Sequence, residues 1–378
     1  MRVFNIGFIV LFIAMLALPL VFVDLSSDRF SAEENRMLAE RPELADIREH
    51  PGFFAYCFDA WFKDRTGFRK QLIKLYNFIY KNHWINGFWY RDGETVYLIG
   101  EHGHHYYAGD GSLIKKFQGR QFLSDEQLKN TAVKLEEVKT YLDNKGIPFV
   151  VMFCTDKETV YPEFYPKTIQ RGPEPVQLDI ITGYFQEYTS VDVFNIRQAL
   201  LAEKNNHLLY DISSGDLTHY TEIGAFFAYR ELMKHVNSHF PEIVPFELDD
   251  IDISYNEMGI PDVSLKTKRT YKELPPSFFD DVELKRPFSW ENAAFENNNP
   301  DLPVILFLRD SYTSYDDKKF ITQFIASHFG RAIFIHYQNM EHFEEYIAKY
   351  KPDIVVFESA ERQLCYFSDC VAGIPGLP

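Results

Sequence analysis

A serine that could act as a nucleophile lies within residues 306–320, LFLRDSYTSYDDKKF. The apolar residues 304–308 indicate a strand that is buried on both faces of a sheet, and Ser311 follows the end of that strand. Active sites of open α/β sheets lie beyond the carboxyl ends of their strands, so Ser311 is a candidate nucleophile. The alternative interpretation is that Ser311, or another polar residue of this segment, caps the following helix.

A serine hydroxyl needs a base within hydrogen-bond reach and a group that orients the base. The segment 213–233, SSGDLTHYTEIGAFFAYRELM, supplies both types of residue. Asp216 and His219 are three residues apart ahead of an expected amphipathic helix, so the carboxylate can hold one imidazole nitrogen while the other nitrogen faces a serine. In the alternative interpretation, Asp216 or Thr218 caps the helix and His219 is partly buried.

Metal chemistry has weaker support in this sequence. The histidines of residues 101–107, EHGHHYY, lack the i, i+4 spacing of a helical metal pair and have no neighbouring cysteine. The acidic segment 247–254 lacks the glycine and the terminal glutamate of an EF-hand calcium loop. The sequence therefore predicts no metal site.

The candidate residues lie in a chain that alternates between strands and helices. Strands are expected at 94–100, 147–153, 191–196, 304–308, 332–336 and 353–358, and helices at 124–143, 176–189, 221–238, 317–328 and 339–350. This alternation predicts an α/β fold with a mostly parallel sheet and helices on both faces. Residues 241–302 form a long acidic stretch with little periodicity, which we interpret as an insertion.

The first 28 residues differ from the rest in character. Residues 4–23, FNIGFIVLFIAMLALPLVFV, carry no charge and are long enough to cross a hydrocarbon core of ~30 Å. Arg2 precedes this run and Asp24 follows it, so the positive-inside rule leaves the N-terminus in the cytoplasm and exports the rest. We predict a single-pass signal anchor in the cell membrane; a cleaved signal peptide is the alternative. The predicted domains are this anchor over 1–28, a helical segment over 29–90 and a catalytic domain over 91–378 with the insertion at 241–302.

The composition limits the possible partners and the role of disulfides. The net charge of −16 lacks the basic footprint that nucleic acids need and disfavours docking on anionic lipid head groups. Four cysteines are few for 378 residues, so disulfides are not the main source of stability. In an exported chain, Cys365 and Cys370 are close enough in sequence to form a bridge.

The exported part of the chain resembles the alginate O-acetyltransferase group of SGNH hydrolase-like proteins, the AlgX/AlgJ type. The resemblance consists of six segments in the order of that family: AEENRMLAERPEL, FDAWFKDRTGFRKQLIKLYN, GIPFVVMFCTDKETVYPEFYP, GDLTHYTEIGAFFAYRELM, VILFLRDSYTSY and KPDIVVFESAERQL. It implies an SGNH hydrolase-like, flavodoxin-like fold for the catalytic domain. By position, it implies Ser311 as the nucleophile, His219 as the general base and Asp216 as the group that orients the base.

One departure from the family pattern concerns the orienting aspartate. The family has an aspartate two residues before the histidine, in a D-x-H-W arrangement. Here Leu217 holds that place, Asp216 is one residue further back, and Tyr220 replaces the tryptophan. The D-x-x-H spacing of this chain is that of ordinary SGNH hydrolases, so the same geometry remains possible.

A second departure concerns the groups that stabilise the oxyanion. The family's P-N-K segment is Thr155-Asp156-Lys157 in this chain, and an ionised aspartate cannot donate a hydrogen bond as an asparagine can. We therefore expect backbone N–H groups near Ser311 and Tyr312 to stabilise the oxyanion, with Arg309 and Lys157 as further donors. Glu361 and Arg362, after the last strand, are interpreted as a salt bridge that supports the site, or, for Arg362, as a substrate contact.

The resemblance implies an extracytoplasmic O-acetyltransferase that modifies an exopolysaccharide through a covalent acetyl-serine. It implies no metal and no organic cofactor. Because acetyl-CoA is cytoplasmic, the expected partner is a multi-pass membrane-bound O-acyltransferase that supplies acetyl groups. Two alternatives remain: a polysaccharide acetylesterase with the same triad, and a catalytically degenerate scaffold of an acylation or export complex.

Overall fold

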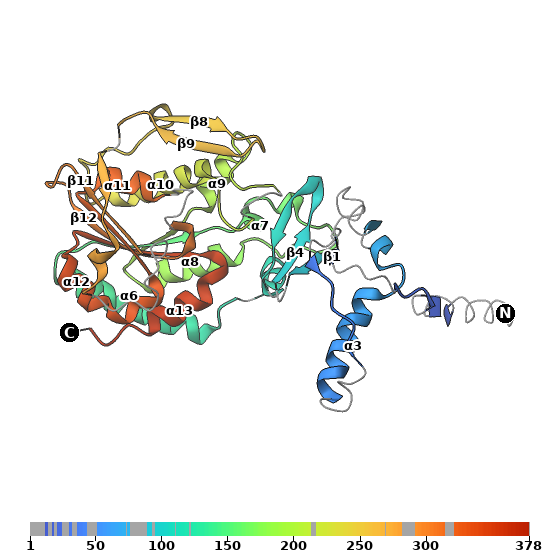
Figure 1. Ribbon diagram of the computed structural model, residues 1–378. Coiled ribbons are helices and arrows are strands. Elements are labelled where there is room, and N and C mark those ends of the chain that lie inside the picture. The colour runs from blue at the N-terminus through green and yellow to red at the C-terminus, as the bar shows by residue number, and fades with distance from the viewer. Residues whose placement is uncertain are drawn as a thin grey trace. The chain divides into compact units, whose positions relative to one another are not determined.

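A computed structural model gives the coordinates of the chain (Figure 1). It describes residues 12–13, 17–18, 21–24, 30–31, 36–43, 51–72, 74–75, 89–92, 95–109, 111–120, 122–212, 217–268, 270–281, 292–313 and 321–377. The chain forms two compact units, residues 1–85 and residues 86–378. The predicted division into an anchor, a helical segment and a catalytic domain stays a prediction.

The first unit contains the helix α3, Pro51–Arg65, and the two-stranded pair β1 (Phe30–Ser31) and β2 (Arg36–Met37). Helix α3 ends just before Thr66-Gly67. Only glycine fits at position 67, because a Cβ there would lie 2.5 Å from the Phe22 carbonyl oxygen. The predicted membrane span, residues 4–23, lies largely outside the described residues. None of the helices within the described residues has the length and the apolar character needed to cross a membrane.

The second unit is built on a mixed sheet. Within the described residues this sheet has seven strands, in the order β10-β11-β13-β12-β14-β6-β7. Their bounds are β6 Phe149–Cys154, β7 Asp192–Asn195, β10 Tyr271–Glu273, β11 Ala293–Asn297, β12 Val304–Arg309, β13 Arg331–His336 and β14 Ile354–Ala360. The strands from β13 to β7 run parallel, as the sequence predicts, whereas β10 and β11 join the β13 edge antiparallel.

Helices cover both faces of this sheet (Figure 1). One face is covered by α9 (Arg197–Glu203), α10 (Glu222–Asn237) and α11 (Thr322–His328), and the other by α6 (Asp125–Asp143), α8 (Gln177–Tyr188), α12 (Phe343–Tyr350) and α13 (Leu364–Ala372). Strand β12 shows why two layers form. Ile305 and Phe307 contribute to one core and Leu306 and Leu308 to the other, so the strand is apolar along its length.

The 241–302 stretch contains more structure than its sequence indicates. Strands β8 (Ile251–Tyr255) and β9 (Pro261–Leu265) form an antiparallel hairpin, and β10 and β11 extend the main sheet. Strand β11 pairs with β13, from which it is separated by more than thirty residues of sequence, so no local pattern signals the pairing. Part of the 241–302 stretch, strands β10 and β11, therefore extends the main sheet.

The other described elements adjoin the carboxyl edge of the sheet or connect its strands. Strands β3 (Trp89–Asp92), β4 (Thr95–Ile99) and β5 (His105–Tyr107) form a small antiparallel sheet, and the short helices are α5 (Ser112–Phe117) and α7 (Lys157–Val160). All four cysteines lie within the described residues and are free. Cys365 and Cys370 both belong to α13, and five residues along a helix place them roughly 140° apart around its axis. That separation explains why these two thiols are free although they are close in sequence.

Candidate functional site

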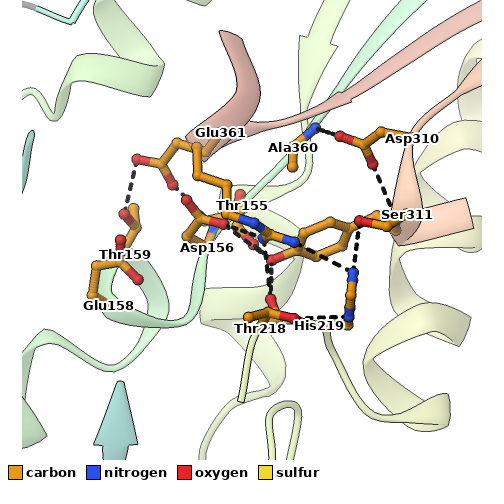
Figure 2. A network of polar contacts seen from close by, with 12 residues as sticks. Thr155, Asp156, Glu158, Thr159, Thr218, His219, Asp310, Ser311, Ala360 and Glu361 are labelled. Atoms are coloured by element: carbon orange, nitrogen blue, oxygen red, sulfur yellow. Dashed lines mark hydrogen bonds and ion pairs between the residues drawn. The ribbon is translucent and has the colours of Figure 1, made fainter. Parts of the chain in front are cut away.

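Three neighbouring strands end at the candidate site. Strands β12, β14 and β6 are adjacent and parallel in the sheet, so their carboxyl ends lie at one edge. The residues that follow these ends are Ser311 after β12, Glu361 after β14 and Asp156 after β6. Figure 2 shows these residues converging, together with His219 from the segment before α10.

Ser311 and His219 are in direct contact (Figure 2). The Ser311 Oγ lies 2.8 Å from the His219 Nε2, although the two residues are 92 positions apart in the chain. Both residues are partly exposed, so a substrate has access to them. On the other side of the ring, the Thr218 Oγ1 lies 2.9 Å from the His219 Nδ1. The structure thus brings together the predicted nucleophile and the predicted base.

The contacts of His219 also determine which ring nitrogen carries the proton. Arg362 Nη2 lies 3.3 Å from the same Nε2 atom, and a guanidinium can only donate. Nε2 must therefore be an acceptor, and the proton of the neutral ring lies on Nδ1. This is the tautomer that a general base needs, because its lone pair faces the hydroxyl that it deprotonates.

The segment that carries His219 is fixed by the start of helix α10. The Thr221 side chain caps this helix by accepting a hydrogen bond from the Gly224 N–H, and the Thr221 N–H donates to the Leu209 carbonyl at 2.9 Å. Gly224 allows this close approach, because a Cβ there would lie 2.6 Å from the Leu209 oxygen. The cap is therefore neither Asp216 nor Thr218. Asp216, the predicted orienting carboxylate, lies outside the described residues, so its role stays a prediction.

Asp310 fixes the turn that carries Ser311, and sequence reasoning missed it. Its Oδ1 accepts the Tyr312 N–H at 2.9 Å and its Oδ2 accepts the Ala360 N–H at 2.6 Å, so it ties the serine turn to the end of β14 (Figure 2). Its own N–H donates to Glu358 Oε2 at 3.0 Å. Burial, together with the adjacent Asp310 charge, raises the pKa of Glu358 well above its ordinary value.

Two of the predicted oxyanion donors are occupied by other contacts. The Tyr312 N–H donates to Asp310, and the Tyr312 hydroxyl donates to the Thr218 carbonyl at 2.8 Å. Lys157 Nζ donates to the carbonyl oxygens of His105, Asp211 and Ile212, at 2.7 Å for His105 and 3.0 Å for Ile212. An ammonium has three protons, and these three carbonyls use them.

The occupied donors have a structural role. Burial lowers the pKa of Lys157 to about 7, and its contacts tie β5 to the segment that leads to His219. The other predicted side-chain donor, Arg309, is fully buried at the end of β12 and donates to the Asp310 carbonyl at 3.1 Å. The hydrogen bonds of these side chains hold backbone segments together around the site.

A set of buried charged side chains adjoins the Ser311–His219 pair. This charge cluster consists of Lys116, Asp156, Glu158, Glu361 and Arg362. Lys116 Nζ lies 2.7 Å from Asp156 Oδ2, 3.0 Å from Glu158 Oε1 and 3.3 Å from Glu361 Oε1. Arg362 Nη1 lies 2.7 Å from Asp156 Oδ1, so Arg362 and Glu361 take different partners. No side chain of the cluster is more than 8% exposed, which shields these ion pairs from water.

The charge cluster has two basic and three acidic side chains, so one carboxyl is in excess. Burial alone would raise the pKa of Asp156, but Lys116 and Arg362 outweigh it and hold that pKa below its ordinary value. Burial raises the pKa of Glu158 to about 7, against the attraction of Lys116. Burial raises the pKa of Glu361 as well, so Glu158 and Glu361 are the two carboxyls that can hold the excess proton.

The histidines of residues 101–107 show no arrangement for a metal. Within the described residues, no group of three or more His, Cys, Asp or Glu side chains is placed to hold a metal ion. The His104 ring instead stacks on Phe164, with ring centroids 4.2 Å apart, and burial lowers the pKa of His104 to about 4. The structure thus places His104 in an aromatic contact.

Comparison with known proteins supports the resemblance that the sequence suggests. Residues 116–252 match the model of the SGNH hydrolase-like domain of the acetyltransferase AlgX. This part of the chain is similar to the SGNH hydrolase-like domain of AlgX. The resemblance predicted from the sequence is thereby confirmed, and this family is one of SGNH hydrolase-like acetyltransferases. No curated protein matches the chain by sequence.

Solved structures with the same fold are distant in sequence. Bacillus cereus PatB1 with a sulfonyl adduct aligns with a TM-score of 0.51 and 12% identity, over 74% of this chain and 97% of that one. A DHHW family protein from Eubacterium siraeum aligns with a TM-score of 0.50 and 12% identity, over 76% and 97%. The O-acetyltransferase domain of Pseudomonas putida AlgJ aligns with a TM-score of 0.44 and 14% identity, over 71% and 91%. At these identities, the first two alignments show a shared fold and no more.

Proposed function

We propose that this protein is an O-acetyltransferase that transfers acetyl groups to hydroxyls of a cell-surface or exported polysaccharide through an acetyl ester on Ser311. The observation that carries the proposal is the 2.8 Å contact between the Ser311 Oγ and the His219 Nε2 at the carboxyl end of β12. The match of residues 116–252 to an acetyltransferase domain supports the reaction class. The partly exposed position of both residues supports their use on an external substrate.

The first half of the reaction forms the acetyl ester. The Ser311 Oγ attacks the carbonyl carbon of the acetyl donor while its proton passes to the His219 Nε2, whose lone pair already faces it. The electron pair of the carbonyl moves to oxygen, and a tetrahedral intermediate forms. When this intermediate collapses, the donor group leaves with the proton from His219, and the acetyl group remains on Ser311.

The second half transfers the acetyl group to the sugar. A sugar hydroxyl takes the place of the leaving group, and the His219 Nε2 removes its proton as it attacks the ester carbonyl. Collapse of the second tetrahedral intermediate returns the proton to the Ser311 Oγ and releases the acetylated sugar. Asp216 orients the Nδ1 side of the imidazole in this proposal. Water in place of the sugar would give acetate, which is the esterase reaction.

The proposed location and partner follow from the N-terminal sequence. The uncharged run at residues 4–23, between Arg2 and Asp24, supports a single-pass anchor with the catalytic unit outside the cytoplasm. An extracytoplasmic site needs an acetyl donor that has crossed the membrane. We assign that supply to a multi-pass membrane-bound O-acyltransferase.

The test uses the full-length chain purified in detergent, with p-nitrophenyl acetate as the donor and short oligosaccharides as acceptors. Ser311→Ala and His219→Ala are each expected to lower the rate by about 10³-fold or more, because each removes a member of a cooperating pair. Mass spectrometry of the wild-type protein is expected to show an acetyl adduct on Ser311. Ser327→Ala, a serine on α11, is the matched control and should retain full activity.

The products of the same assay separate the alternatives. Acetylated oligosaccharide as the main product supports the transferase, whereas acetate alone would support the esterase. Ser311→Ala with wild-type activity would contradict both. Ser311→Ala that fully restores polysaccharide acetylation in a deletion strain would support the scaffold.

A further inference from the structure

We propose that Arg362 is a catalytic residue of this site: its Nη2 group donates the hydrogen bond that stabilises the oxyanion, and Asp156 holds it in position. This inference rests on the proposed acyl transfer through Ser311. It concerns a group that the sequence interprets mainly as part of a supporting salt bridge.

Arg362 and Ser311 contact the same atom. Arg362 Nη2 lies 3.3 Å from the His219 Nε2, and the Ser311 Oγ lies 2.8 Å from that nitrogen. The Nη2 group thus lies beside the atom that receives the proton from the Ser311 Oγ. An acyl carbon bonded to the Ser311 Oγ would bring its own oxygen into the same small region.

The guanidinium is held in one orientation by contacts on its other sides. Nη1 donates to Asp156 Oδ1 at 2.7 Å and to the Thr218 carbonyl at 3.2 Å. The guanidinium carbon lies 4.8 Å from the centre of the Tyr312 ring, a cation–π distance. The Arg362 side chain is only 8% exposed. A donor fixed in this way before the reaction needs no reorganisation when charge develops, which is the condition for strong electrostatic stabilisation.

The reaction itself creates the need for this donor. In the resting site, the lone pair of Nε2 accepts the Ser311 hydroxyl and also faces Nη2. When the Ser311 Oγ bonds to the acyl carbon, its proton moves to Nε2 and the carbonyl electron pair moves to the acyl oxygen. Nε2 then has no lone pair left, so the Nη2–H loses this acceptor and the new oxyanion replaces it. The contact is therefore made only in the transition state, which is what raises kcat.

Two of the predicted donors, the Tyr312 N–H and Lys157, are engaged elsewhere. The Tyr312 N–H donates to Asp310 and the Lys157 ammonium donates to three backbone carbonyls. The Asp156 carboxylate cannot donate, but it binds Arg362 through one oxygen and Lys116 through the other. Asp156 thus contributes as a positioning residue. Asp156 stands where the P-N-K segment of the family has an asparagine, which would be a neutral donor. In this chain, Asp156 instead positions Arg362, which is a cationic donor.

The test measures steady-state kinetics of the full-length chain with p-nitrophenyl acetate. Arg362→Gln is expected to lower kcat by about 10²- to 10³-fold with KM changed by less than about threefold, the pattern of a lost oxyanion donor. Arg362→Lys, which keeps the charge, should recover part of that loss. The matched control is Arg197→Gln, because Arg197 is also 8% exposed and forms ion pairs, with Glu174 and Asp179, away from the site.

A second readout separates catalysis from structure. A trifluoromethyl ketone forms a tetrahedral adduct with an active serine and carries an oxyanion. Arg362→Gln should weaken its inhibition by the same factor as it lowers kcat/KM, which a purely structural role would not produce. Asp156→Asn should show a smaller loss in both, since the asparagine oxygen still accepts from Nη1 but the ionic attraction is gone.

The outcomes distinguish this inference from the proposed function. If Ser311→Ala is inactive but Arg362→Gln retains kcat and inhibitor affinity within about threefold of wild type, the role of Arg362 is overturned and the proposed function stands. If Ser311→Ala is fully active, both fail. If Arg362→Gln does not fold, Arg362→Lys and Asp156→Asn decide: unchanged inhibitor affinity in both overturns the role of Arg362, and parallel losses in kcat and inhibitor affinity support it.

Discussion

The Ser311–His219 pair and the charge cluster lie at the same edge of the sheet but differ in burial and in number of partners. The pair consists of two partly exposed residues joined by one 2.8 Å contact. The charge cluster joins five side chains, none more than 8% exposed, from α5, α7 and the ends of β6 and β14. Arg362 is the member that contacts both groups.

This difference indicates that the Ser311–His219 pair provides reactivity and that the charge cluster contributes to stability. A reactive pair must stay accessible, so it gains little free energy from its contact and depends on others for its position. A buried cluster is the opposite case, because removal of one charge leaves its partners without compensation in a medium of low dielectric constant. We therefore expect mutations of the Ser311–His219 pair to lower activity with little change in stability, and mutations of the charge cluster to lower stability. The activity losses expected for Ser311, His219 and Arg362 variants form one half of this comparison.

The largest stability effect is expected for Lys116→Met. Methionine fills a similar volume but leaves the carboxylates of Asp156 and Glu361 with Arg362 as their remaining cation in the charge cluster. Breaking a buried pair in this way typically costs about 3–5 kcal/mol of the free energy of unfolding. Urea denaturation at pH 7.5, followed by circular dichroism, measures the change.

The control for this prediction is a surface pair of the same type. Lys139 pairs with Asp143 on α6, where the aspartate side chain is 53% exposed. Lys139→Met should change the free energy of unfolding by about 0–1 kcal/mol, the usual range for exposed pairs. Equal effects of the two substitutions would show that the charge cluster contributes no more than a surface pair.

A smaller, pH-dependent effect is expected for Glu158→Gln. The pKa of Glu158 is raised by burial from 4.5 to about 7 in the folded chain. Between these two pH values the folded chain holds a proton that the unfolded chain has released, so this group makes the free energy of unfolding fall as pH rises through that window and levels off above it. Glutamine does not titrate. The variant should therefore gain about 1–3 kcal/mol relative to wild type between pH 4.5 and pH 8.

The measurement is urea denaturation of both proteins at several pH values, because other groups contribute equally to both curves. Glu137→Gln, at a 46% exposed position on α6, serves as the control and should show no such difference. Parallel pH curves for wild type and Glu158→Gln would mean that Glu158 is already ionised at low pH and that another carboxyl holds the excess proton.

The smallest stability effect is expected for Ser311→Ala. The substitution removes one hydrogen bond at a partly exposed position, and His219 retains its contacts with Thr218 and Arg362. We expect a change in the free energy of unfolding within about 0.5 kcal/mol of zero. A thermal melt and a urea titration would both detect a larger effect. A loss above about 2 kcal/mol would show that the pair is a structural contact as well as a reactive one.

The sequence predicts the central elements of the fold because each has a local signal. The apolar run 304–308 is part of β12, and Ser124 with Gln127 forms a capping box at the start of α6. The strands β10 and β11 have no such signal, since they are short and their hydrogen-bond partners are distant in sequence. Propensity and periodicity act over one or two turns of chain, so they detect an element only when its own residues define it.

The sequence by itself also determined the candidate nucleophile and base. Ser311 follows an apolar strand and His219 precedes an amphipathic helix. The apolar residues of these two elements can be recognised in the sequence, so both positions can be found without the structure. It did not identify Asp310, Lys116 or Glu158, whose residue types are common and carry no spacing signal. Their roles depend on contacts such as that between the Asp310 Oδ2 and the Ala360 N–H, 50 residues apart.

Only the tertiary structure decided how the site is completed. The parallel order β12-β14-β6 brings three strand ends together, and this order places Asp156 and Arg362 in contact across 206 residues of sequence. Burial then fixes the charges, because ion pairs removed from water must satisfy each other. Local sequence thus specifies which residues are available for chemistry, while strand order and desolvation decide which of them meet and in which protonation state.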